Sequence, residues 1–298
     1  MTAVSMRPTM IGMANARTKR VRRTAEQIRL DEFNQTTAET DAQVARRIRE
    51  RFDILEYLAN QSAKGQLRAL VVSGPPGLGK SFTIEKVLAE RDPNQVTHTV
   101  VKGYVKPTGL VKLLYRHRQK GRVLVLDDSD TVFADETSLN MLKSACDSGS
   151  NRKISYLAEG TLIDEISGER VEKEFKFEGT IIFITNLDFD KLIDKGHKFA
   201  PHLAAMVSRA HYVDVTLKTK RDYLIRMKQV IDAGMLADRG LSRNAVDEIL
   251  SFVDEYSDQF RELSLRLISK LADIREGQME AENFRDWRDI AKITCCKQ

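Results

Sequence analysis

The sequence predicts an α/β protein, a three-layer sandwich with a mainly parallel sheet between helices, followed by a C-terminal α-helical lid. Two observations lead to this fold class. Short apolar runs typical of buried strands alternate with helical patterns as far as residue 217. From residue 218 onward the apolar residues recur only at helical spacing. We therefore expect three parts: a basic, flexible N-terminal arm over 1–40, an α/β domain over 41–217 and a helical lid domain over 218–298.

The predicted elements follow one another in a regular order. A first helix begins near Asp41, and the expected strands span 67–72, 96–101, 122–128, 180–186 and 211–217. The expected helices between them cover 82–91, 110–119, 139–146 and 199–207. The alternating segments 154–157 and 171–177 predict an antiparallel excursion that turns at Ser167-Gly168. The helical patterns of the lid cover 223–233, 243–256, 260–275 and a last piece near 284–293.

Composition excludes several classes of protein. No apolar run approaches the length of a membrane span, and the N-terminus has no signal-peptide pattern, so we expect a cytoplasmic protein without a membrane partner. Cys146, Cys295 and Cys296 have neither metal-site nor disulfide-framework spacing, which fits a reducing interior. The net charge is +5, and seven basic residues face one acid between Met1 and Leu30. This arm suits phosphate backbones or an acidic partner; a solvated tail is the other interpretation.

The clearest chemical signal is the loop between the first full strand and its helix. Gly74, Gly79, Lys80 and Ser81 fit the spacing Gly-x-x-x-x-Gly-Lys-Ser/Thr. In such a loop backbone N–H groups turn towards phosphate, the lysine reaches the β- and γ-phosphates, and the hydroxyl is a ligand of Mg²⁺. A plain glycine turn would not explain a lysine beside a hydroxyl at its end. We expect the nucleotide to lie on Gly74, Pro75, Pro76, Gly77, Leu78, Gly79, Lys80, Ser81 and Phe82.

Polar residues follow two later strands of the predicted sheet. Asp127 and Asp128 end the apolar run that begins at Val123, and Asn186 ends the strand at 180–186. In an open α/β sheet the carboxyl edge of the strands is where ligands bind. We therefore expect Asp127 to hold Mg²⁺ and Asp128 to orient the attacking water. A helix cap or turn is the alternative interpretation of the two aspartates.

The order of these motifs resembles the AAA+ superfamily of ATPases over about Phe52 to Arg275. The matching positions are Gly74–Ser81 for Walker A, Val123–Asp128 for Walker B, Asn186 for sensor 1, Arg209 in Ser-Arg-Ala for the arginine finger and Arg266 for sensor 2. The resemblance implies that ATP is hydrolysed with Mg²⁺ at sites shared between subunits of a homo-oligomer, most often a hexameric ring or spiral.

The resemblance also implies roles for three of these side chains. Asn186 would share the catalytic water or a γ-oxygen with Asp128. Arg209 would project into the site of the neighbouring subunit, where the transition state gathers negative charge. Arg266 would report the γ-phosphate to the lid. Either arginine could instead form a surface salt bridge, and Arg261 or Arg275 would replace Arg266 if the helical register differs.

One position departs from the family pattern. The second Walker B acid is usually glutamate, whereas Asp128 is shorter by one methylene. Positioning of water is sensitive to about an ångström, so we expect either slow hydrolysis or a contribution from Asp130. Residues 68–74 and 126–130 are similar to AAA+ proteins encoded by bacteriophages, which places the expected compartment in the cytoplasm of the host.

The use of the ATP has three interpretations. The basic arm, the excursion and the arginine box favour a DNA-associated motor or loader, although the excursion itself carries no excess of basic residues. Tyr104 and Val105 lie where the central-pore loop of unfoldases grips a protein chain, and Lys102 and Lys106 beside them equally suit a phosphate backbone. The third interpretation is a slowly hydrolysing switch that assembles with ATP and releases a partner protein or adaptor.

Overall fold

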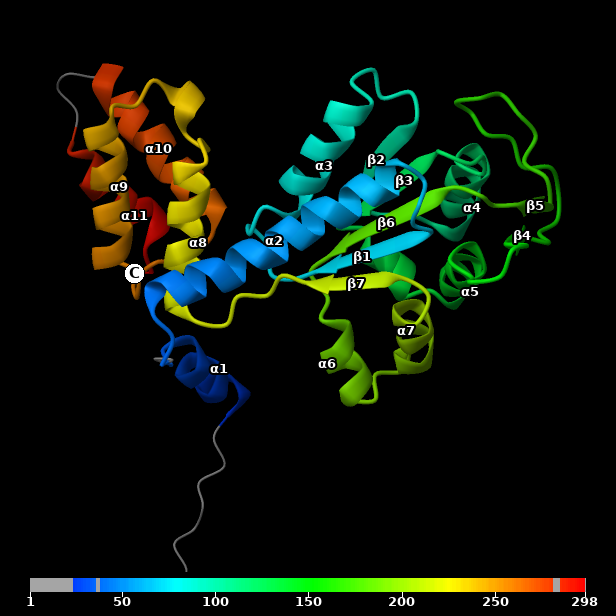
Figure 1. Cartoon of the computed structure of the whole chain (residues 1–298), viewed down its shortest axis with the longest axis horizontal. Coiled ribbons are helices and arrows are strands. Elements are labelled where there is room, and N and C mark those ends of the chain that lie inside the picture. Colours follow the sequence, from blue (N-terminus) through cyan, green and yellow to red (C-terminus); the bar gives the residue numbers. More distant parts are fainter. Residues whose placement is uncertain (1–23, 36–37, 281–284, 298) are drawn as a thin grey trace, which may run out of the picture.

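A sheet of five parallel strands forms the centre of the molecule (Figure 1). The computed structural model describes residues 24–35, 38–280 and 285–297. The strands are β1 Ala69–Ser73, β2 His98–Lys102, β3 Val123–Asp127, β6 Thr180–Thr185 and β7 His211–Asp214, in the spatial order β2-β3-β6-β1-β7. All four pairings are parallel. The excursion is also present, as the antiparallel pair β4 Lys153–Ser155 and β5 Glu174–Lys176.

Helices cover both faces of the sheet and then form a separate group. Those of the α/β part are α2 Asp41–Ala63, α3 Lys80–Arg91, α4 Pro107–Arg116, α5 Glu136–Ala145, α6 Phe189–Asp194 and α7 Ala200–Val207, with a 3-10 turn η1 at Asp130–Phe133. The C-terminal group is α8 Lys220–Asp232, η2 Ala237–Arg239, α9 Arg243–Glu255, α10 Leu265–Glu280 and α11 Trp287–Cys295. Within the described residues, no helix combines the length and apolarity needed to cross a membrane.

The apolar core lies in two layers, one on each face of the sheet. Successive strand residues point to opposite faces, so Val71 and Phe183 pack with α4, α5, α6 and α7, whereas Val72 and Ile184 pack with α2 and α3. Because every residue of β1, β3 and β6 is buried, these strands read as continuous apolar runs, as expected for a parallel sheet covered on both sides. The α/β fold class predicted from the sequence is confirmed.

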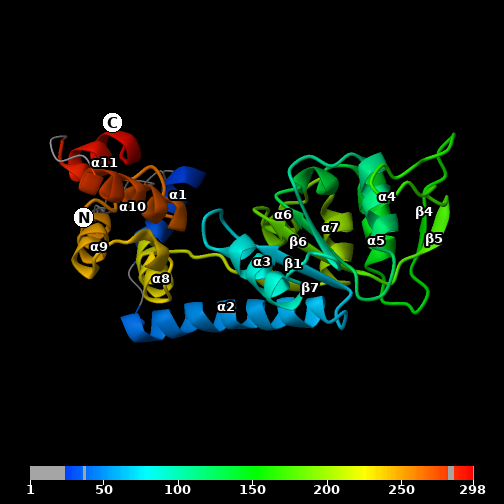
Figure 2. The same ribbon diagram turned by 90° about the horizontal axis from the view of Figure 1, so that it is seen from above.

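The C-terminal helices pack around a third apolar core of their own. Phe252 and Trp287 lie at its centre, with ring centroids 5.1 Å apart. Long α2 runs beside both groups of helices, contacting α3 at one end and α8 at the other (Figure 2). The predicted C-terminal group of helices is therefore present, and it packs on α2 through α8.

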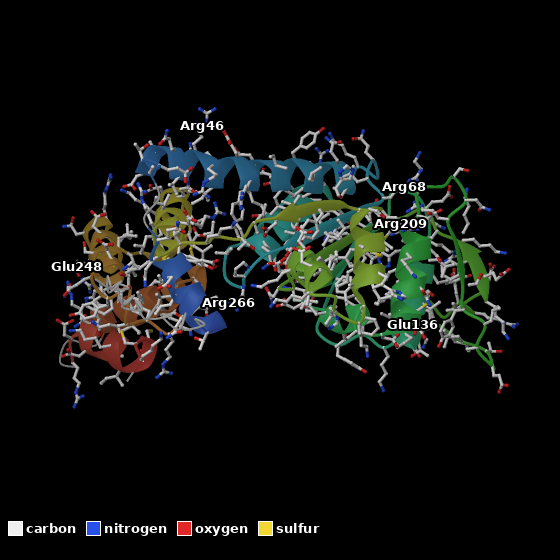
Figure 3. All side chains as sticks on the ribbon, turned by 90° about the horizontal axis from the view of Figure 1, so that it is seen from below. Arg46, Arg68, Glu136, Arg209, Glu248 and Arg266 are labelled. Carbon is white, nitrogen blue, oxygen red and sulfur yellow. The ribbon has the colours of Figure 1, made fainter. Side chains whose placement is uncertain are left out.

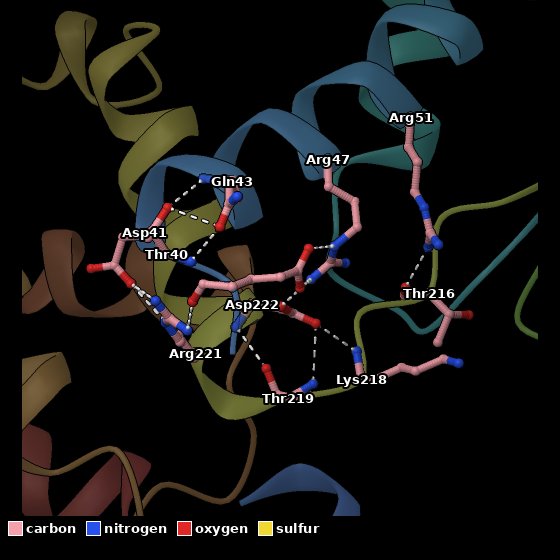
Figure 4. Close-up of polar contacts among 11 residues, drawn as sticks. Thr40, Asp41, Gln43, Arg47, Arg51, Thr216, Lys218, Thr219, Arg221 and Asp222 are labelled. Atoms are coloured by element: carbon pink, nitrogen blue, oxygen red, sulfur yellow. Dashed lines mark hydrogen bonds and ion pairs between the residues drawn. The ribbon is translucent and has the colours of Figure 1, made fainter. Parts of the chain in front are cut away.

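A cluster of ion pairs and hydrogen bonds joins α2 to the segment that enters the lid (Figure 4). Asp222, which is 3% exposed, accepts hydrogen bonds from the backbone N–H groups of Lys218 and Thr219 and pairs with Arg47 at 3.0 Å. Arg51 donates to the carbonyl oxygen of Thr216 at 2.9 Å. These contacts fix the start of α8 against α2, so the lid is anchored at this junction.

The structure differs from the sequence-based prediction at residues 24–35. This part of the predicted flexible arm contains α1 Ala25–Phe33, which begins with a capping box between Thr24 and Gln27. Phe33 packs against Tyr223 of the lid, with ring centroids 5.9 Å apart. The basic cluster at residues 17–23 lies outside the described residues.

Two helices of the structure also differ from the predicted ones. The short helix α6 was not predicted, because six residues capped by Asp188 leave no readable apolar period. Helix α10 begins at Leu265 rather than at residue 260, because Phe260 pairs with Cys296 as an isolated bridge and the hydroxyl of Ser264 accepts from the N–H of Leu267. This later start places the first turn of α10 against the glycine-rich loop.

Candidate functional site

The glycine-rich loop connects β1 to α3 at the carboxyl edge of the sheet. Gly77 and Gly79 have φ values of +73° and +94°, which side chains other than glycine rarely adopt. Gly79 is the N-cap of α3, so the backbone N–H groups of the first helical turn face the loop. Leu78 buries its side chain in the core, whereas Phe82 is 72% exposed at the edge of the loop. This is the backbone shape that a phosphate group requires.

Lys80 lies at the centre of the site and is 5% exposed. Its Nζ donates to the carbonyl oxygens of Gly74 and Pro75, at 2.5 and 2.8 Å, and to Oδ1 of Asn186 at 3.0 Å. All three acceptors are neutral. Burial lowers the pKa of Lys80 from 10.5 to about 8, although the charges of Asp128 and Asp127 act in the opposite direction. A buried ammonium held only by neutral oxygens is well suited to an anionic ligand.

Asn186 connects Lys80 to the first carboxylate beyond β3. Its Nδ2 donates to Oδ1 of Asp128 at 2.7 Å. The two side chains meet because β3 and β6 are parallel neighbours and both residues follow the carboxyl ends of their strands. Asp128 is exposed and has φ +50°, a left-handed conformation that aspartate adopts more readily than glutamate. This backbone conformation suits the aspartate that stands at position 128.

Ser81 and Asp127 form the other half of the site. The hydroxyl of Ser81 donates to Oδ1 of Asp127 at 3.0 Å, and Asp127 is 4% exposed. Burial raises the pKa of Asp127, and the hydrogen bond from Ser81 lowers it in part. An adjacent hydroxyl and carboxylate oxygen fit Mg²⁺, which is bound in such sites by one or two protein oxygens together with phosphate and water.

Two charged residues near Asp127 were not predicted as part of the site. Lys102, at the end of β2, has its Nζ 2.7 Å from Oε1 of Glu85 and 3.7 Å from Oδ2 of Asp127. Glu85 lies one helical turn after Ser81, and β2 is the neighbour of β3 with Lys102 opposite Asp127. Both positions could have been found from the sequence by asking which residues share a helix face or a strand end with a predicted ligand.

Asp130 lies in a different environment from Asp128. Its Oδ1 accepts from the hydroxyl of Thr185 at 2.5 Å, and it also accepts from the backbone N–H of Asn186. Burial raises the pKa of Asp130, and these hydrogen bonds lower it in part. Asp130 is thus held by hydrogen bonds from Thr185 and the backbone of Asn186, whereas Asp128 is exposed to solvent.

The lid contacts the glycine-rich loop directly through the first turn of α10. The N–H of Leu265 donates to the carbonyl oxygen of Gly77 at 2.8 Å. A Cβ on Gly77 would lie 2.6 Å from Cβ of Ser264, so only glycine permits this approach. Arg266, next in the helix, is exposed, and its charge contributes to the lowered pKa of Lys80.

The structure separates Arg266 from the two arginines that could have replaced it. Arg261 donates its Nε to the carbonyl oxygen of Cys296 at 3.1 Å, and Arg275 pairs with Glu248 at 3.3 Å. Both side chains are thus held by partners within the C-terminal part of the chain, although Arg261 is exposed and Arg275 is half-buried. Of the three arginines, Arg266 is the one in the helical turn that contacts the glycine-rich loop.

A further arginine next to the loop was missed entirely. Arg226 of α8 lies with its Cζ 3.4 Å from the ring centroid of Phe52 in α2. Its Nη2 is 3.7 Å from the place that a Cβ on Gly79 would occupy. No sequence signal marks this residue, because its place depends on how the lid packs on α2.

Arg209 lies on the opposite half of the molecule, just after α7 (Figure 3). Its Nη1 donates to the carbonyl oxygen of Ala205 at 2.8 Å, and its Nε lies 3.6 Å from Asp147. One third of the side chain is exposed. Figure 3 shows it well apart from Arg266, so the chain does not bring Arg209 to its own glycine-rich loop.

Only one residue of the predicted pore-loop pair is exposed. Tyr104 is 71% exposed, but Val105 is 7% exposed and packs in the core beside Leu110 and Val111. The N–H of Val105 also lies 3.5 Å from the hydroxyl of Thr131. The prediction that both side chains are available to a substrate is wrong, because Val105 holds this loop against α4 and η1.

Known proteins resemble the chain both in fold and in sequence. No protein-family model matches the chain. Among solved structures, a mutant of RuvB from Thermotoga maritima is similar, with a TM-score of 0.51 and 15% identity over 84% of this chain and 69% of that chain. NtrX from Brucella abortus in complex with ATP matches with a TM-score of 0.45 and 15% identity over 88% of this chain and 56% of that chain, which is too low to add to the assignment. The likeness to RuvB agrees with the α/β fold described above, and at 15% identity it concerns the fold alone.

One curated relative is considerably closer in sequence. It is the uncharacterized 36.7 kDa protein in the nrdC-mobD intergenic region of Enterobacteria phage T4, which is 36% identical over 229 residues. The match covers 76% of this chain and 69% of that protein. The predicted resemblance to a bacteriophage-encoded protein is confirmed to this extent, and the chain belongs to the same protein family as this phage T4 protein.

Proposed function

We propose that the protein is an ATPase that binds ATP with Mg²⁺ on Gly74–Ser81 and hydrolyses it. The observation that carries this proposal is the hydrogen-bonded series from Lys80 through Asn186 to Asp128, with the Ser81–Asp127 pair beside it. A structural turn would not require a buried lysine with neutral acceptors next to a carboxylate with access to solvent. The test is hydrolysis of ATP by the purified protein, compared with the Lys80→Ala variant.

Each side chain has a role in the proposed reaction. Lys80 and the N–H groups of the loop would bind the phosphate oxygens, and Asn186 would position the terminal phosphate. Asp128 would orient a water whose oxygen attacks the γ-phosphorus, while the bond to the β-phosphate oxygen breaks and ADP and phosphate form. Mg²⁺, held by Ser81 and Asp127, would neutralise charge on the phosphate oxygens. Because Asp128 is short, we expect slow turnover.

We further propose that the site is completed by a second copy of the chain in a ring or spiral. The placement of Arg209 away from its own loop supports this, since its side chain is one third exposed and would reach a neighbour by exchanging its contacts with Ala205 and Asp147. Mixing Lys80→Ala and Arg209→Ala subunits tests the proposal, because each variant supplies what the other lacks. Partial recovery of hydrolysis is expected; no recovery at any ratio would show that Arg209 does not act between subunits.

The proposed architecture divides the chain into an N-terminal arm over 1–40, an ATPase domain over 41–217 and a lid domain over 218–298. The separate apolar cores of the sheet and the lid support the division near Lys218. Under limited proteolysis, cleavage at the segment before α8 that is slowed by ATP would agree with a lid that closes on the nucleotide. Cleavage that is unaffected by ATP would argue against closure.

For the use of the ATP, we propose nucleic acid as the partner. Tyr104 is exposed between Lys102 and Lys106, which are exposed as well, although the ammonium of Lys102 lies 2.7 Å from Glu85. An aromatic ring beside the ammonium of Lys106 suits stacked bases and phosphates. The basic arm predicted from the sequence adds to this. DNA should stimulate hydrolysis in a salt-dependent manner, and Tyr104→Ala should remove the stimulation while basal hydrolysis continues.

Protein remodelling is the second candidate, and the same exposed Tyr104 favours it. If an unstructured protein stimulates hydrolysis and DNA does not, this second function replaces the first. If neither does, and ATP only changes the oligomeric state, the protein is a nucleotide-dependent assembly switch. Sizing the protein with and without ATP, and then with DNA, separates these outcomes.

A further inference from the structure

Arg226 occupies an unusual place at the meeting point of the lid, α2 and the glycine-rich loop. Its guanidinium lies over the face of Phe52, whose ring is 6% exposed, with Cζ 3.4 Å from the ring centroid. A planar cation on an aromatic face gains a favourable electrostatic contact. The stacking fixes the guanidinium in one orientation but supplies no anion.

The guanidinium has no anionic partner in the part of the chain that the structure describes. Its Nε is buried without a hydrogen-bond acceptor. Burial lowers the pKa of Arg226 to about 10, and the charge of Asp53 offsets only part of this effect. Arg226 is therefore still a cation at neutral pH. Arg226 is half-buried, and a cation whose Nε is enclosed without an acceptor is unfavourable, so an anion from outside the chain would stabilise it here.

Other arginines at the same junction are satisfied (Figure 4). Arg47 pairs with Glu39 and Asp222, Arg51 donates to a backbone carbonyl oxygen, and Arg221 pairs with Asp41. Arg47, Arg51 and Arg221 thus each have an oxygen acceptor at this junction. Among these four arginines, Arg226 is the one without a hydrogen-bond acceptor in the described residues. Arg226 therefore differs from the arginines that only link the lid to α2.

The direction of approach indicates which part of a ligand would meet Arg226. Nη2 of Arg226 lies next to Gly79, the N-cap residue of α3. It approaches the loop from the lid. Lys80, in contrast, extends towards Asn186, beside which Asp128 lies. A phosphate chain lying along the loop would present its terminal group to Asn186 and its inner phosphates to Gly79.

We propose that Arg226 binds an oxygen of the α- or β-phosphate of the bound nucleotide and so anchors α8 to the phosphate chain. The proposal rests on the proposed function, because it requires a nucleotide on Gly74–Ser81. Since ADP and ATP share these phosphates, Arg226 contributes equally to both. Arg226 thus differs from Arg266, whose role depends on the γ-phosphate.

The test compares Arg226→Met with Arg221→Met, a control on the same helix whose guanidinium pairs with Asp41 on the surface. Methionine keeps apolar contact with Phe52 and removes the charge. Binding of ADP and ATP with Mg²⁺ is measured by calorimetry, and thermal unfolding is measured without nucleotide. For Arg226→Met, we expect both affinities to fall about tenfold or more, with equal or higher stability of the nucleotide-free protein. Arg221→Met should leave both affinities unchanged.

The opposite pattern would overturn the proposal. If Arg226→Met destabilises the nucleotide-free protein and binds both nucleotides as tightly as the wild type, the guanidinium only supports the lid. Arg226→Lys, which keeps a charge but loses the planar fork, should bind with intermediate affinity. If the wild type binds neither nucleotide, the proposed function fails and this proposal fails with it; unchanged binding by Arg226→Met alone overturns only the role of Arg226.

Discussion

The two sides of the candidate site are built in opposite ways. On the sheet side, Lys80, Asn186 and Asp128 are joined by hydrogen bonds of 2.7 to 3.0 Å, and Ser81 is bonded to Asp127. On the lid side, Arg226 and Arg266 form no hydrogen bond or ion pair with any residue that the structure describes. The sheet side is preorganised, whereas the lid side presents positive charge that the protein itself does not neutralise.

This difference indicates how binding and movement are divided. Side chains that already hold one another need little reorganisation when a phosphate arrives, so the sheet side should determine whether the nucleotide binds. The lid touches the loop through the Leu265–Gly77 hydrogen bond, and its arginines gain an anion only with the ligand. The lid side should therefore determine how binding is converted into closure.

The largest effect is expected for the centre of the sheet side. Lys80→Ala removes the ammonium and its three hydrogen bonds, so the affinity for both ATP and ADP should fall by about 100-fold or more. Calorimetry with Mg²⁺ present measures this. Lys86→Ala is the control, because Lys86 lies on the same helix, exposed, 3.9 Å from Glu90. Similar losses in both variants would show that the loop is not the binding site.

The second prediction concerns the carboxylate at the end of the sheet-side series. Asp128→Asn keeps the shape and the tolerance for φ +50°, so nucleotide affinity should stay within about twofold while hydrolysis falls by about 100-fold. Single-turnover assays separate the two quantities. Asp130→Asn should have the smaller effect on the rate, because Asp130 is fixed by Thr185 rather than facing the site. If Asp130→Asn loses more hydrolysis than Asp128→Asn, Asp130 rather than Asp128 orients the attacking water.

The third prediction addresses the lid side. Arg266→Ala should weaken ATP binding about five- to tenfold and leave ADP binding unchanged, since only ATP carries the phosphate that Arg266 would meet. Competition between the two nucleotides gives the ratio directly. Arg261→Ala is the control, because Arg261 is also exposed but donates to the carbonyl oxygen of Cys296. Equal weakening of ATP and ADP would show that Arg266 does not sense the γ-phosphate.

The smallest change in nucleotide binding is expected for Lys102, which lies next to the proposed Mg²⁺ ligand Asp127. Its ammonium lies 3.7 Å from Asp127 and 2.7 Å from Glu85, so it competes with a cation for their charge. Because Lys102 is mostly exposed, Lys102→Met should lower the Mg²⁺ concentration for half-maximal ATP binding by only about two- to threefold. A fluorescent ATP analogue follows this titration. A rise in that concentration would mean that Lys102 assists the ion instead.

The sequence allowed the sheet side to be predicted because its signals are local. Gly74–Ser81 is a spacing motif, and Asp127 and Asn186 follow short apolar runs typical of buried parallel strands, which the structure pairs. The parallel order then brings their carboxyl ends together. The lid side depends on packing between distant segments, so nothing in the neighbourhood of Arg226 marks it in the sequence.

The errors have the same origin. Val105 follows Tyr104 in an apparently exposed loop, but the residue is buried because it packs beside Leu110 and Val111. Phe33 holds α1 on the lid through Tyr223, a contact between residues 190 positions apart that no local pattern shows. Tertiary contacts of this kind decide which residues of a polar segment become ordered.

The most direct test of the division between the two sides is one set of titrations. ATP and ADP are each titrated, with Mg²⁺, into the wild type, Lys80→Ala and Arg266→Ala. We expect the wild type to bind both nucleotides, Lys80→Ala to lose both, and Arg266→Ala to lose only its preference for ATP. Binding of either nucleotide by Lys80→Ala at the affinity of the wild type would show that the sheet side does not determine binding.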